Sequence, residues 1–507
     1  MKLKFLREIV VKSTNKLTSV KSDALVIFFD HAKPFKEFMN ELEQHDHHIS
    51  TYLKTLPSFE ESLKQDWLNV VDILTPYTQC PRLLIVGIGV KKNEWVARSR
   101  QLGLRIGQEV KKKKLNQLTV LAFEALLLDQ FQIGLSLGLY EYPKRIDKDE
   151  KIENLHITFV SNHTIKSPTE LLEAIGVCRW LQDMPPNHCH SEFISSTFKI
   201  FSKPMKNVSM KLFKKEDLQK KKMGGILAVG QGSAKDVQLL VLEYKPKTFS
   251  KTLSLVGKGI TMDTGGYAIK TPSTNQEGMK YDMSGAAVVL SSLLAIARLD
   301  LPIHVYAVTP LCENMIDAEA FRVSDVITMY SGKTVEIKNT DAEGRIVLAD
   351  ALWYASQDLK SDFIIDFATL TSAIITTFGH VGAGVFSFDD ELTQIIEQAA
   401  QMTGERIGCL PVWDEVAEDC KGDISDLMNL GKTRGCAGSM LAAGFLKEFT
   451  CDTPYAHIDI AGVADSNQAI GYPRQGGSGY GVQLAVQVAD LLSNERINKI
   501  KAKKRKS

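Results

Sequence analysis

The chain has 507 residues, of which 44% are hydrophobic, and its formal net charge is +1. This length exceeds what one hydrophobic core usually supports, so we expect at least two domains. A net charge this small gives no general argument for a nucleic-acid partner. The chain has no run of about 20 apolar residues, so we expect no membrane span. It also shows no leader-like start, and its eight cysteines form no C-x-x-C pair, so we expect a cytoplasmic protein with reduced thiols.

The first region alternates apolar runs with helical patterns, which predicts an N-terminal α/β domain over residues 1–165 with a buried sheet. Its strand-like runs are residues 24–29, 83–87, 118–122 and 157–160. The group His45-Asp46-His47-His48 is a possible metal chelator. A solvated helix face is the more common explanation for such a group.

A helix-like pattern follows from Pro168 to Met184 and ends at Pro185-Pro186. We take residues 166–186 as a linker helix and place the domain junction there. Strand and helix signals then alternate again over residues 187–495, so the second domain is also α/β. Its clearest strands are residues 239–242, 253–256, 303–308, 334–337 and 363–367.

The loops after the strands of this second domain hold most of the unusual chemistry. Loops in these positions are where α/β sheets bind ligands. The polar residues of these loops are Lys258, Asp263, Lys270, Asp282, Asp341, Glu343 and Arg345.

The run Asn339-Thr340-Asp341-Ala342-Glu343-Gly344-Arg345 is consistent with a metal and anion site. Asp341 and Glu343, separated by one residue, can turn toward one point. Arg345 lies where we expect a helix over residues 346–355 to begin, and helix N-termini favour anions. On these seven residues alone, an ordinary acidic turn explains the run equally well.

Four carboxylates in one cleft repel each other unless cations neutralise them. Two divalent metals would do so. Oxygen-rich ligation with one amine suits zinc, manganese, magnesium or cobalt, and paired metals roughly 3.5–4 Å apart can share a hydroxide nucleophile.

Four motifs closely resemble those of the leucyl (cytosol) aminopeptidase family, in the family's order. They are residues 257–266, 279–283, 312–315 and 339–345. The resemblance extends over roughly residues 170–490. It implies a smaller N-terminal α/β domain and a larger C-terminal catalytic domain, residues 187–495, with a mixed central sheet flanked by helices.

The resemblance also implies a residue for each task. The tighter metal would be held by Lys258, Asp263, Asp282 and Glu343, and the exchangeable metal by Asp263, Asp341 and Glu343. Lys270 would polarise the scissile carbonyl. Arg345 would hold a bicarbonate ion that relays a proton.

The activity implied is release of N-terminal amino acids from peptides by a metal-bridging hydroxide. One metal would bind the free α-amine of the peptide, which must be unprotonated, so we expect an alkaline optimum. The resemblance further implies a homohexamer, built as a dimer of trimers.

The implied substrate pocket contains Met279, Thr369, Leu370 and Ser372. The family usually has glycine at the position of Ser372, so we expect an altered preference for the first side chain. Residues 429–438 and 465–481 also depart from the family's pattern. These departures leave the metal ligands intact but put the preferred substrates in doubt.

Three alternatives stay open. A two-metal phosphoesterase could use the same carboxylates but would usually want histidines, which these loops lack. Ser331-Gly332-Lys333-Thr334 mimics the end of a phosphate-binding loop, but it leads into an expected strand instead of a helix. A nucleic-acid-binding or structural role rests on the basic tail, residues 496–507, for which a frayed terminus is the usual explanation.

Overall fold

The computed structural model describes residues 7–17, 20–30, 34–63, 68–88, 94–122, 126–143, 154–161, 165, 167–433, 435–465 and 468–493. Contacts divide the chain into two compact units. The N-terminal unit comprises residues 2–172 with 470–473, and the larger unit comprises residues 173–469 with 474–507. The basic tail lies outside the described residues, so nucleic-acid binding there stays a prediction.

The N-terminal unit is built on a six-stranded sheet of order β1-β6-β5-β2-β4-β3. Neighbouring strands are parallel except β3 and β4, which are antiparallel. All four strands predicted in this region are present. The strands are β1 (Ile9–Thr14), β2 (Ala24–Asp30), β3 (Val70–Leu74), β4 (Arg82–Ile88), β5 (Gln117–Leu121) and β6 (Leu155–Val160).

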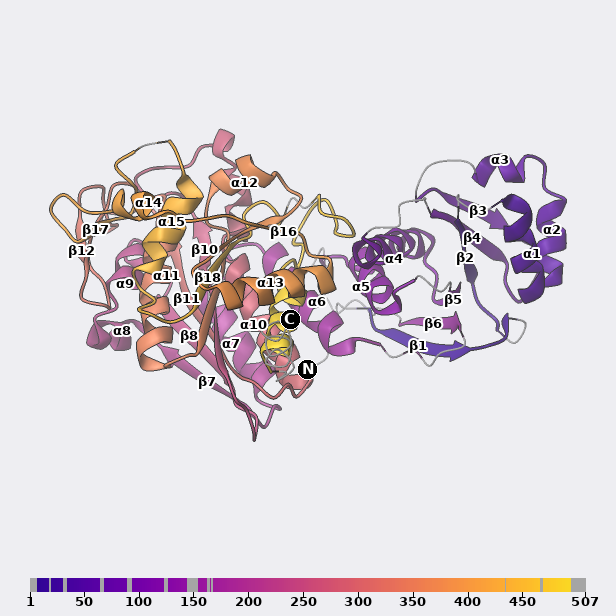
Figure 1. Ribbon diagram of the computed structural model, residues 1–507, viewed down its shortest axis with the longest axis horizontal. Coiled ribbons are helices and arrows are strands. Elements are labelled where there is room, and N and C mark those ends of the chain that lie inside the picture. Colours follow the sequence, from indigo (N-terminus) through magenta and orange to yellow (C-terminus); the bar gives the residue numbers. More distant parts are fainter. Residues whose placement is uncertain are drawn as a thin grey trace, which may run out of the picture. The chain divides into compact units, whose positions relative to one another are not determined.

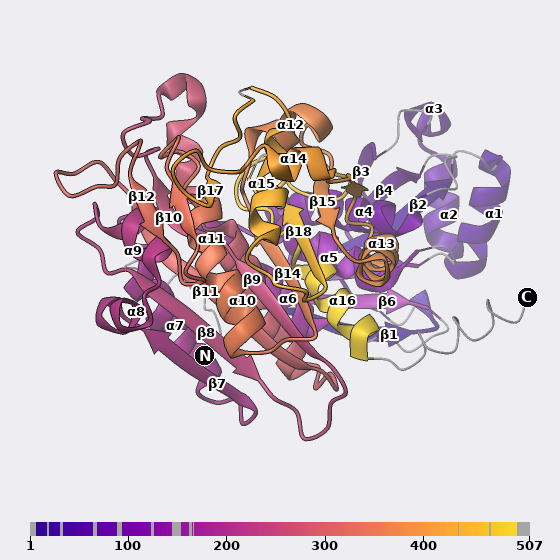
Figure 2. The same ribbon diagram turned by 60° about the vertical axis from the view of Figure 1, so that its left-hand side comes forward.

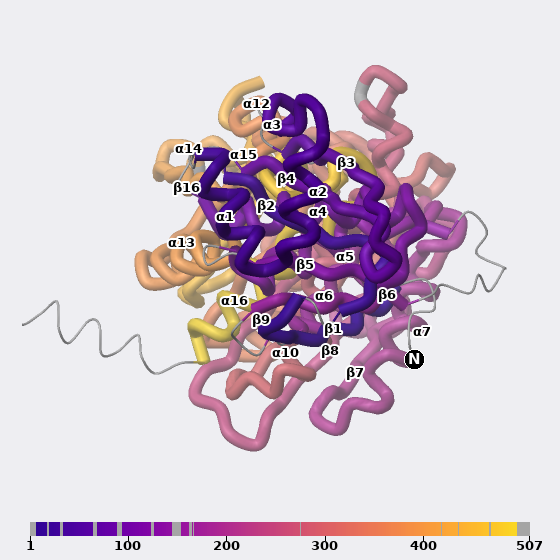
Figure 3. The backbone as a smooth tube through the Cα atoms, turned by 90° about the vertical axis from the view of Figure 1, so that its right-hand side faces the viewer, coloured from indigo at the N-terminus to yellow at the C-terminus, as the bar shows by residue number. Residues whose placement is uncertain are grey.

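Helices cover both faces of this sheet because alternate residues of its central strands are apolar on each side. Leu25 and Ile27 of β2 pack with α1, α2 and α3, while Val26 and Phe28 pack with α4 and α5. Figure 1 shows the sheet between these two groups of helices, and Figure 3 looks onto α1 and α2. The helices are α1 (Phe35–His45), α2 (His47–Lys54), α3 (Phe59–Leu63), α4 (Trp95–Lys113) and α5 (Leu128–Leu139).

The larger unit contains a nine-stranded mixed sheet of order β16-β15-β18-β14-β9-β11-β8-β7, with β10 also paired to β11. Its central neighbours β18, β14, β9 and β11 run parallel. The strands are β7 (Val208–Phe213), β8 (Gln238–Tyr244), β9 (Thr252–Gly257), β10 (Gly259–Asp263), β11 (His304–Asn314), β14 (Phe363–Ala368), β15 (Ala383–Ser387), β16 (Ile407–Cys409) and β18 (Tyr455–Asp459).

Helices flank this sheet as well, which confirms the predicted fold class. Apolar residues of α9, α11 and α15 pack in one core with β8, β9 and β14, and Figure 2 shows these three helices together. The helices are α6 (Thr169–Asp183), α7 (Ser191–Ser202), α8 (Lys215–Lys221), α9 (Gly224–Gly230), α10 (Ser284–Arg298), α11 (Gly344–Trp353), α12 (Ser372–Phe378), α13 (Asp390–Thr403), α14 (Asp414–Glu418), α15 (Gly438–Lys447) and α16 (Val482–Ser493).

One helical segment of the described chain, Gln276–Arg298, is long and apolar enough to cross a membrane. Its most apolar window is 83% buried inside the structure. It comprises the 3₁₀ segment η3 (Gln276–Tyr281) and α10, which packs against β9, β11, β14 and α16. Burial in a protein core explains its apolar composition, so the segment is only weak evidence for a membrane span.

The loop expected over residues 257–266 is wrong in part, because residues 259–263 form strand β10. Glycine weakens the local strand signal at position 259. The structure nevertheless needs glycine there, because strand β11 lies close to it. A Cβ at Gly259 would lie 2.5 Å from Pro310 O of β11. Lys258 therefore occupies a one-residue gap between two strands that both pair with β11.

A small three-stranded sheet lies beside the main one, with order β12-β13-β17. Its strands are β12 (Val326–Thr328), β13 (Thr334–Glu336) and β17 (Leu427–Met428). The phosphate-loop mimic forms the tight turn between β12 and β13, where Gly332 has φ 87°. Its Lys333-Thr334 leads into a strand, as predicted, so it lacks the helix that a phosphate-binding loop needs.

Candidate active site

The candidate site lies where several segments of the larger unit end. Lys258 occupies the gap between β9 and β10, and Asp263 ends β10. Asp282 follows η3 and precedes α10, while Glu343 immediately precedes α11. Asp341 belongs to the same loop as Glu343, which follows β13.

The ammonium group of Lys258 lies between two of the carboxylates. Its Nζ lies 2.8 Å from Asp282 Oδ2 and 3.0 Å from Glu343 Oε1, and it donates to Thr369 O at 3.0 Å. The main chain of Lys258 is fixed too, because its N–H donates to Phe367 O and its carbonyl accepts from Ala286 N–H. Its amine therefore points at the carboxylates from a rigid position.

Lys270 contacts the other two carboxylates. Its Nζ lies 3.0 Å from Asp263 Oδ2 and also pairs with Asp341 Oδ1. The backbone reaches this position through Gly265 and Gly266, both of which have positive φ. Lys270 N–H donates to Thr264 O at 2.8 Å, which closes the turn.

Three carboxylates converge on one point. One oxygen each from Asp263, Asp341 and Glu343 lies within 4.8 Å of the others. Glu343 is 1% exposed, and its Oε2 is buried with no hydrogen-bond partner among the described residues. With Asp282, the four carboxylates exceed the two ammonium groups by two negative charges, so the cluster can accommodate cations.

Burial and mutual repulsion set the proton affinities of the cluster. Burial, with repulsion from Glu343, raises the pKa of Asp263 well above its usual value. Burial raises the pKa of Asp282 to about 6, although Lys258 opposes the change. Burial would lower the pKa of Lys258, but attraction from Asp282 and Glu343 outweighs it and raises that pKa. The lysine is therefore a cation until stronger positive charge displaces its proton.

Arg345 lies in the first turn of α11, which begins at Gly344 and not at the expected residue 346. The helix ends at Trp353 and continues as a π-helical turn, Tyr354–Asp358. The Arg345 side chain is 5% exposed, and its Nε and Nη1 have no hydrogen-bond partner among the described residues. Burial lowers the pKa of this guanidinium. A buried cation with two N–H-bearing nitrogens that lack partners among the described residues is suited to holding an anion.

Two asparagines support the cluster, and neither was predicted as a site residue. Asn314 Nδ2 donates to Asp263 Oδ1 at 2.8 Å and to Thr340 O at 3.0 Å. Asn429 donates to Asn339 O at 2.6 Å and accepts from Lys338 N–H at 2.8 Å. Asn314 belongs to the motif at residues 312–315, which was the only sequence signal for it.

The expected substrate-pocket residues are partly brought together. Thr369 donates to Asp282 Oδ1 at 2.8 Å. Leu370 lies beside the cluster, because a Cβ built on Gly344 would lie 2.7 Å from Lys258 Nζ and 2.9 Å from Leu370 Cδ1. Met279 is half-buried in η3, and Ser372 is exposed at the start of α12.

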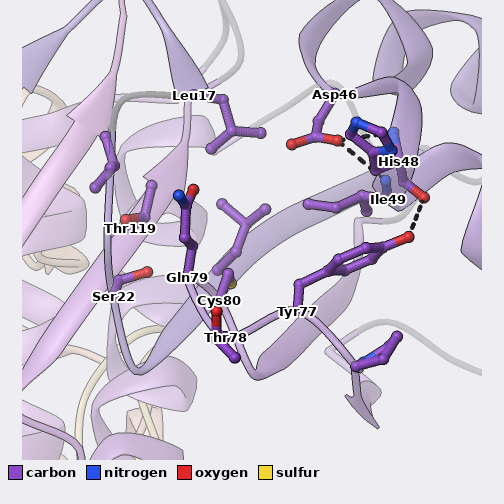
Figure 4. Close-up of a pocket in the computed structure, with 13 residues that line it drawn as sticks. Leu17, Ser22, Asp46, His48, Ile49, Tyr77, Thr78, Gln79, Cys80 and Thr119 are labelled. Atoms are coloured by element: carbon purple, nitrogen blue, oxygen red, sulfur yellow. Dashed lines mark hydrogen bonds between the residues drawn. The ribbon is translucent and has the colours of Figure 1, made fainter.

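A separate cavity of about 340 Å³ lies in the N-terminal unit (Figure 4). It includes two members of the histidine group, Asp46 and His48. Asp46 Oδ1 caps α2 by accepting from His48 and Ile49 N–H at 2.9 and 3.0 Å. His47 and His48 are exposed on α2, which agrees with a solvated helix face. Among the described residues that line this cavity Asp46 is the only carboxylate, so they do not form a group of converging acids like that of the larger unit.

Comparisons with known proteins match this chain to one family. The model of the cytosol aminopeptidase family, catalytic domain, matches residues 176–486. A probable cytosol aminopeptidase of Rickettsia canadensis is 33% identical over 482 residues, covering 91% of this chain and 95% of the relative. A solved variant of tomato leucine aminopeptidase is 27% identical, with a TM-score of 0.83 over 96% of both chains. The bottromycin maturation enzyme BotP in complex with Mn is also 27% identical, with a TM-score of 0.79 over 93% of this chain and 100% of that one.

Proposed function

Since the chain belongs to the cytosol aminopeptidase family, we propose that its carboxylate cluster is a two-metal centre that releases N-terminal residues from peptides. The family match covers more than half of the chain. It confirms the predicted class of enzyme, a metal-dependent aminopeptidase and hence a hydrolase. The phosphoesterase and purely structural alternatives are not favoured.

The observation that carries this proposal is the convergence of Asp263, Asp341 and Glu343, together with a buried Glu343 Oε2 that has no hydrogen-bond partner among the described residues. In our proposal Lys258, Asp263, Asp282 and Glu343 hold the tighter metal. Asp263, Asp341 and Glu343 hold the exchangeable one. Carboxylate oxygens with one neutral amine suit zinc or manganese, and magnesium or cobalt less commonly. The Mn complex of the BotP neighbour supports manganese among these.

The bound metals would lower the pKa of a water molecule and polarise the scissile carbonyl. Lys270 would then be released from its two carboxylates, because metal cations would satisfy Asp263 and Asp341. Its ammonium would stabilise the negative charge that develops on the carbonyl oxygen. Lys258 has to be neutral to act as a ligand, and Thr369 O can accept one of its remaining N–H groups.

Arg345 is proposed to hold a bicarbonate ion near the attacking water. The Nε and Nη1 nitrogens of this buried guanidinium, which lack partners among the described residues, support this role, since a planar oxyanion matches them in shape and charge. The ion would accept a proton at one oxygen while Arg345 keeps it in place.

We further propose that the substrates are peptides with a free N-terminus and that the catalytic domain is residues 187–495. We also propose a cytoplasmic homohexamer, a dimer of trimers, on the strength of the family membership. Met279, Thr369, Leu370 and Ser372 would line the pocket for the first side chain. The half-buried Leu370 beside Gly344 supports this most directly.

The test compares Glu343→Gln with wild type on a panel of amino-acid p-nitroanilides, and measures bound metal by elemental analysis. The variant should lose nearly all hydrolysis and part of its metal, because one bridging carboxylate becomes a neutral amide. Glu336→Gln is the matched control, since Glu336 is also buried, at 6% exposed, but pairs with Lys338 outside the cluster. Full activity and full metal content in Glu343→Gln would refute the two-metal centre.

A further inference from the structure

We propose that Asp459 is a positioning residue that fixes the segment of residues 369–371 and thereby sets the enzyme's preference for the first side chain of a peptide. Asp459 ends strand β18 and is 0% exposed. The inference rests on the proposed function, since it concerns substrate choice at the same site.

Both carboxylate oxygens of Asp459 are bonded. Oδ1 accepts from Leu370 N–H at 3.1 Å and from Ala461 N–H at 3.2 Å. Oδ2 accepts from the Thr371 hydroxyl at 2.6 Å. One buried carboxylate thus holds two consecutive residues of the segment through two contacts, while a third, with Ala461, fixes the carboxylate itself.

Thr371 extends this hold to two helices. Its hydroxyl oxygen caps α12 by accepting from Ile374 N–H at 3.3 Å. The same hydroxyl lies 2.6 Å from Ser439 Oγ in the first turn of α15. The Thr371 side chain is itself buried, so water does not readily replace a contact that is lost.

The opposite end of the segment is tied to the proposed metal ligands. Thr369 O accepts from Lys258 Nζ, and the Thr369 hydroxyl donates to Asp282. Leu370 lies between the two anchors. Its side chain is half-buried. Its Cδ1 would lie 2.9 Å from a Cβ built on Gly344, and that Cβ would lie 2.7 Å from Lys258 Nζ. A shift of Leu370 therefore changes the space beside the ligands, while Thr369 keeps the ligands in place.

Asp459→Asn preserves shape but places an amide NH₂ where Oδ2 accepted, or where Oδ1 accepted if the side chain flips. In the first case the Thr371 hydroxyl must accept from the amide and turn its own proton toward Ser439 Oγ, and in the second case Leu370 N–H loses its acceptor, so the contacts that hold the segment change either way. Among the described residues the carboxylate of Asp459 bonds to Leu370, Thr371 and Ala461 and to none of the proposed metal ligands. We therefore expect metal binding to persist in this variant.

The experiment measures kcat/KM and KM for leucine and alanine p-nitroanilides, with bound metal determined on the same samples. Asp459→Asn should change the leucine-to-alanine ratio of kcat/KM about tenfold, because misplaced apolar contacts discriminate side chains by roughly 10–200-fold. Thr371→Val, which removes the hydroxyl from the other partner, should change the ratio in the same direction. Thr371→Ser, which keeps the hydroxyl, should restore the wild-type ratio.

Asp350→Asn is the matched control. Asp350 is also 0% exposed and accepts main-chain N–H groups, from Ile226 at 3.0 Å and Tyr330 at 2.8 Å. Its loss should lower the yield of folded enzyme and leave the ratio unchanged, as any purely structural defect would.

An unchanged ratio in Asp459→Asn or, where that variant does not fold, in Thr371→Val would overturn the inference. A ratio altered equally in Asp350→Asn would overturn it as well. If the metal-loaded wild type hydrolyses no member of the panel, the proposed function fails first. If wild type is active and the ratio stays constant, only the role of Asp459 fails.

Discussion

The N-terminal unit and the larger unit are both α/β, but they treat buried charge differently. In the N-terminal unit the buried Glu109 has two partners on its own helix, Arg105 at 3.0 Å and Lys113 at 3.3 Å. In the larger unit four buried or half-buried acids share two lysines, and one oxygen of Glu343 has no partner among the described residues. Each carboxylate oxygen of Glu109 has a cationic partner, so the fold alone explains why this charge can be buried.

A surplus of buried negative charge costs stability and needs a further explanation. Within the described residues the larger unit concentrates that surplus around Asp263, Asp341 and Glu343. In our proposal the surplus acids of the larger unit serve a cation, whereas the matched charges around Glu109 in the N-terminal unit serve the fold. Four experiments can break or sharpen this comparison.

Metal removal should have the largest effect on activity. Dialysis against a chelator should abolish hydrolysis and lower the melting temperature of the larger unit, because a metal at 100 times its Kd stabilises the native state by about 2.7 kcal/mol. Calorimetry with and without added metal measures the shift. A chelated enzyme that keeps its full activity would break the comparison, because the surplus acids would then need no cation.

Core truncation in the N-terminal unit should show the reverse pattern. Phe131 is 0% exposed between the sheet and α4, so Phe131→Ala should lower the unfolding free energy of this unit by about 3–5 kcal/mol. Chemical denaturation monitors the loss, and assays below the transition should show kcat unchanged. A matching loss of kcat below the transition would mean that the two units are not independent.

Loss of a supporting asparagine should have an intermediate effect. Asn314→Ala removes a donor to Asp263, and substitution of such outer partners typically costs 10–100-fold in metal affinity or activity. Metal titration with an activity readout measures it. Asn116→Ala is the control, since Asn116 accepts from Arg7 at 2.6 Å in the N-terminal unit, and it should leave metal affinity as in wild type.

Titration of Asp350 should change the free energy of unfolding least, when the change is counted over one pH unit. Burial raises the folded-state pKa of Asp350 to about 7, above its unfolded value of about 3.9. Between these values the folded chain holds the extra proton, so stability falls as pH rises from about 4 to 7, by at most about 1.4 kcal/mol per unit. Urea denaturation at several pH values measures the slope. Asp350→Asn should flatten it, and an equal slope in both proteins would argue against this titration.

Much of the fold was readable from local patterns. The buried strands of both units are short runs of Leu, Ile, Val and Phe, so residues such as Ile85 and Ile365 stand out before any packing is known. The strand β10 was missed because Gly259 weakens the local signal, and its need for glycine comes from Pro310, a residue far along the chain. The start of α11 was misplaced by two residues, since Gly344 is a poor helix former.

The candidate site divides in a similar way. The proposed ligand set comes from the resemblance of four motifs to the family, and within one motif Asp341 and Glu343 lie close together in sequence. The residues that hold the motifs in place lie far from them in sequence. Asn429 and Asp459 act through pairings about 90 residues away, and no pattern of spacing announces a contact of that kind.

The gap between β9 and β10 that holds Lys258 has a consequence for the time at which the site forms. Lys258 bonds to Thr369, 111 residues later, and strand β14 enters the sheet between β9 and β18. A growing chain has exposed every proposed ligand once Glu343 has emerged, but it still lacks β14, β18 and the segment that they support. Long-range pairing of this kind forms slowly. We therefore expect a chain truncated before residue 455 to carry the proposed ligands without a formed site.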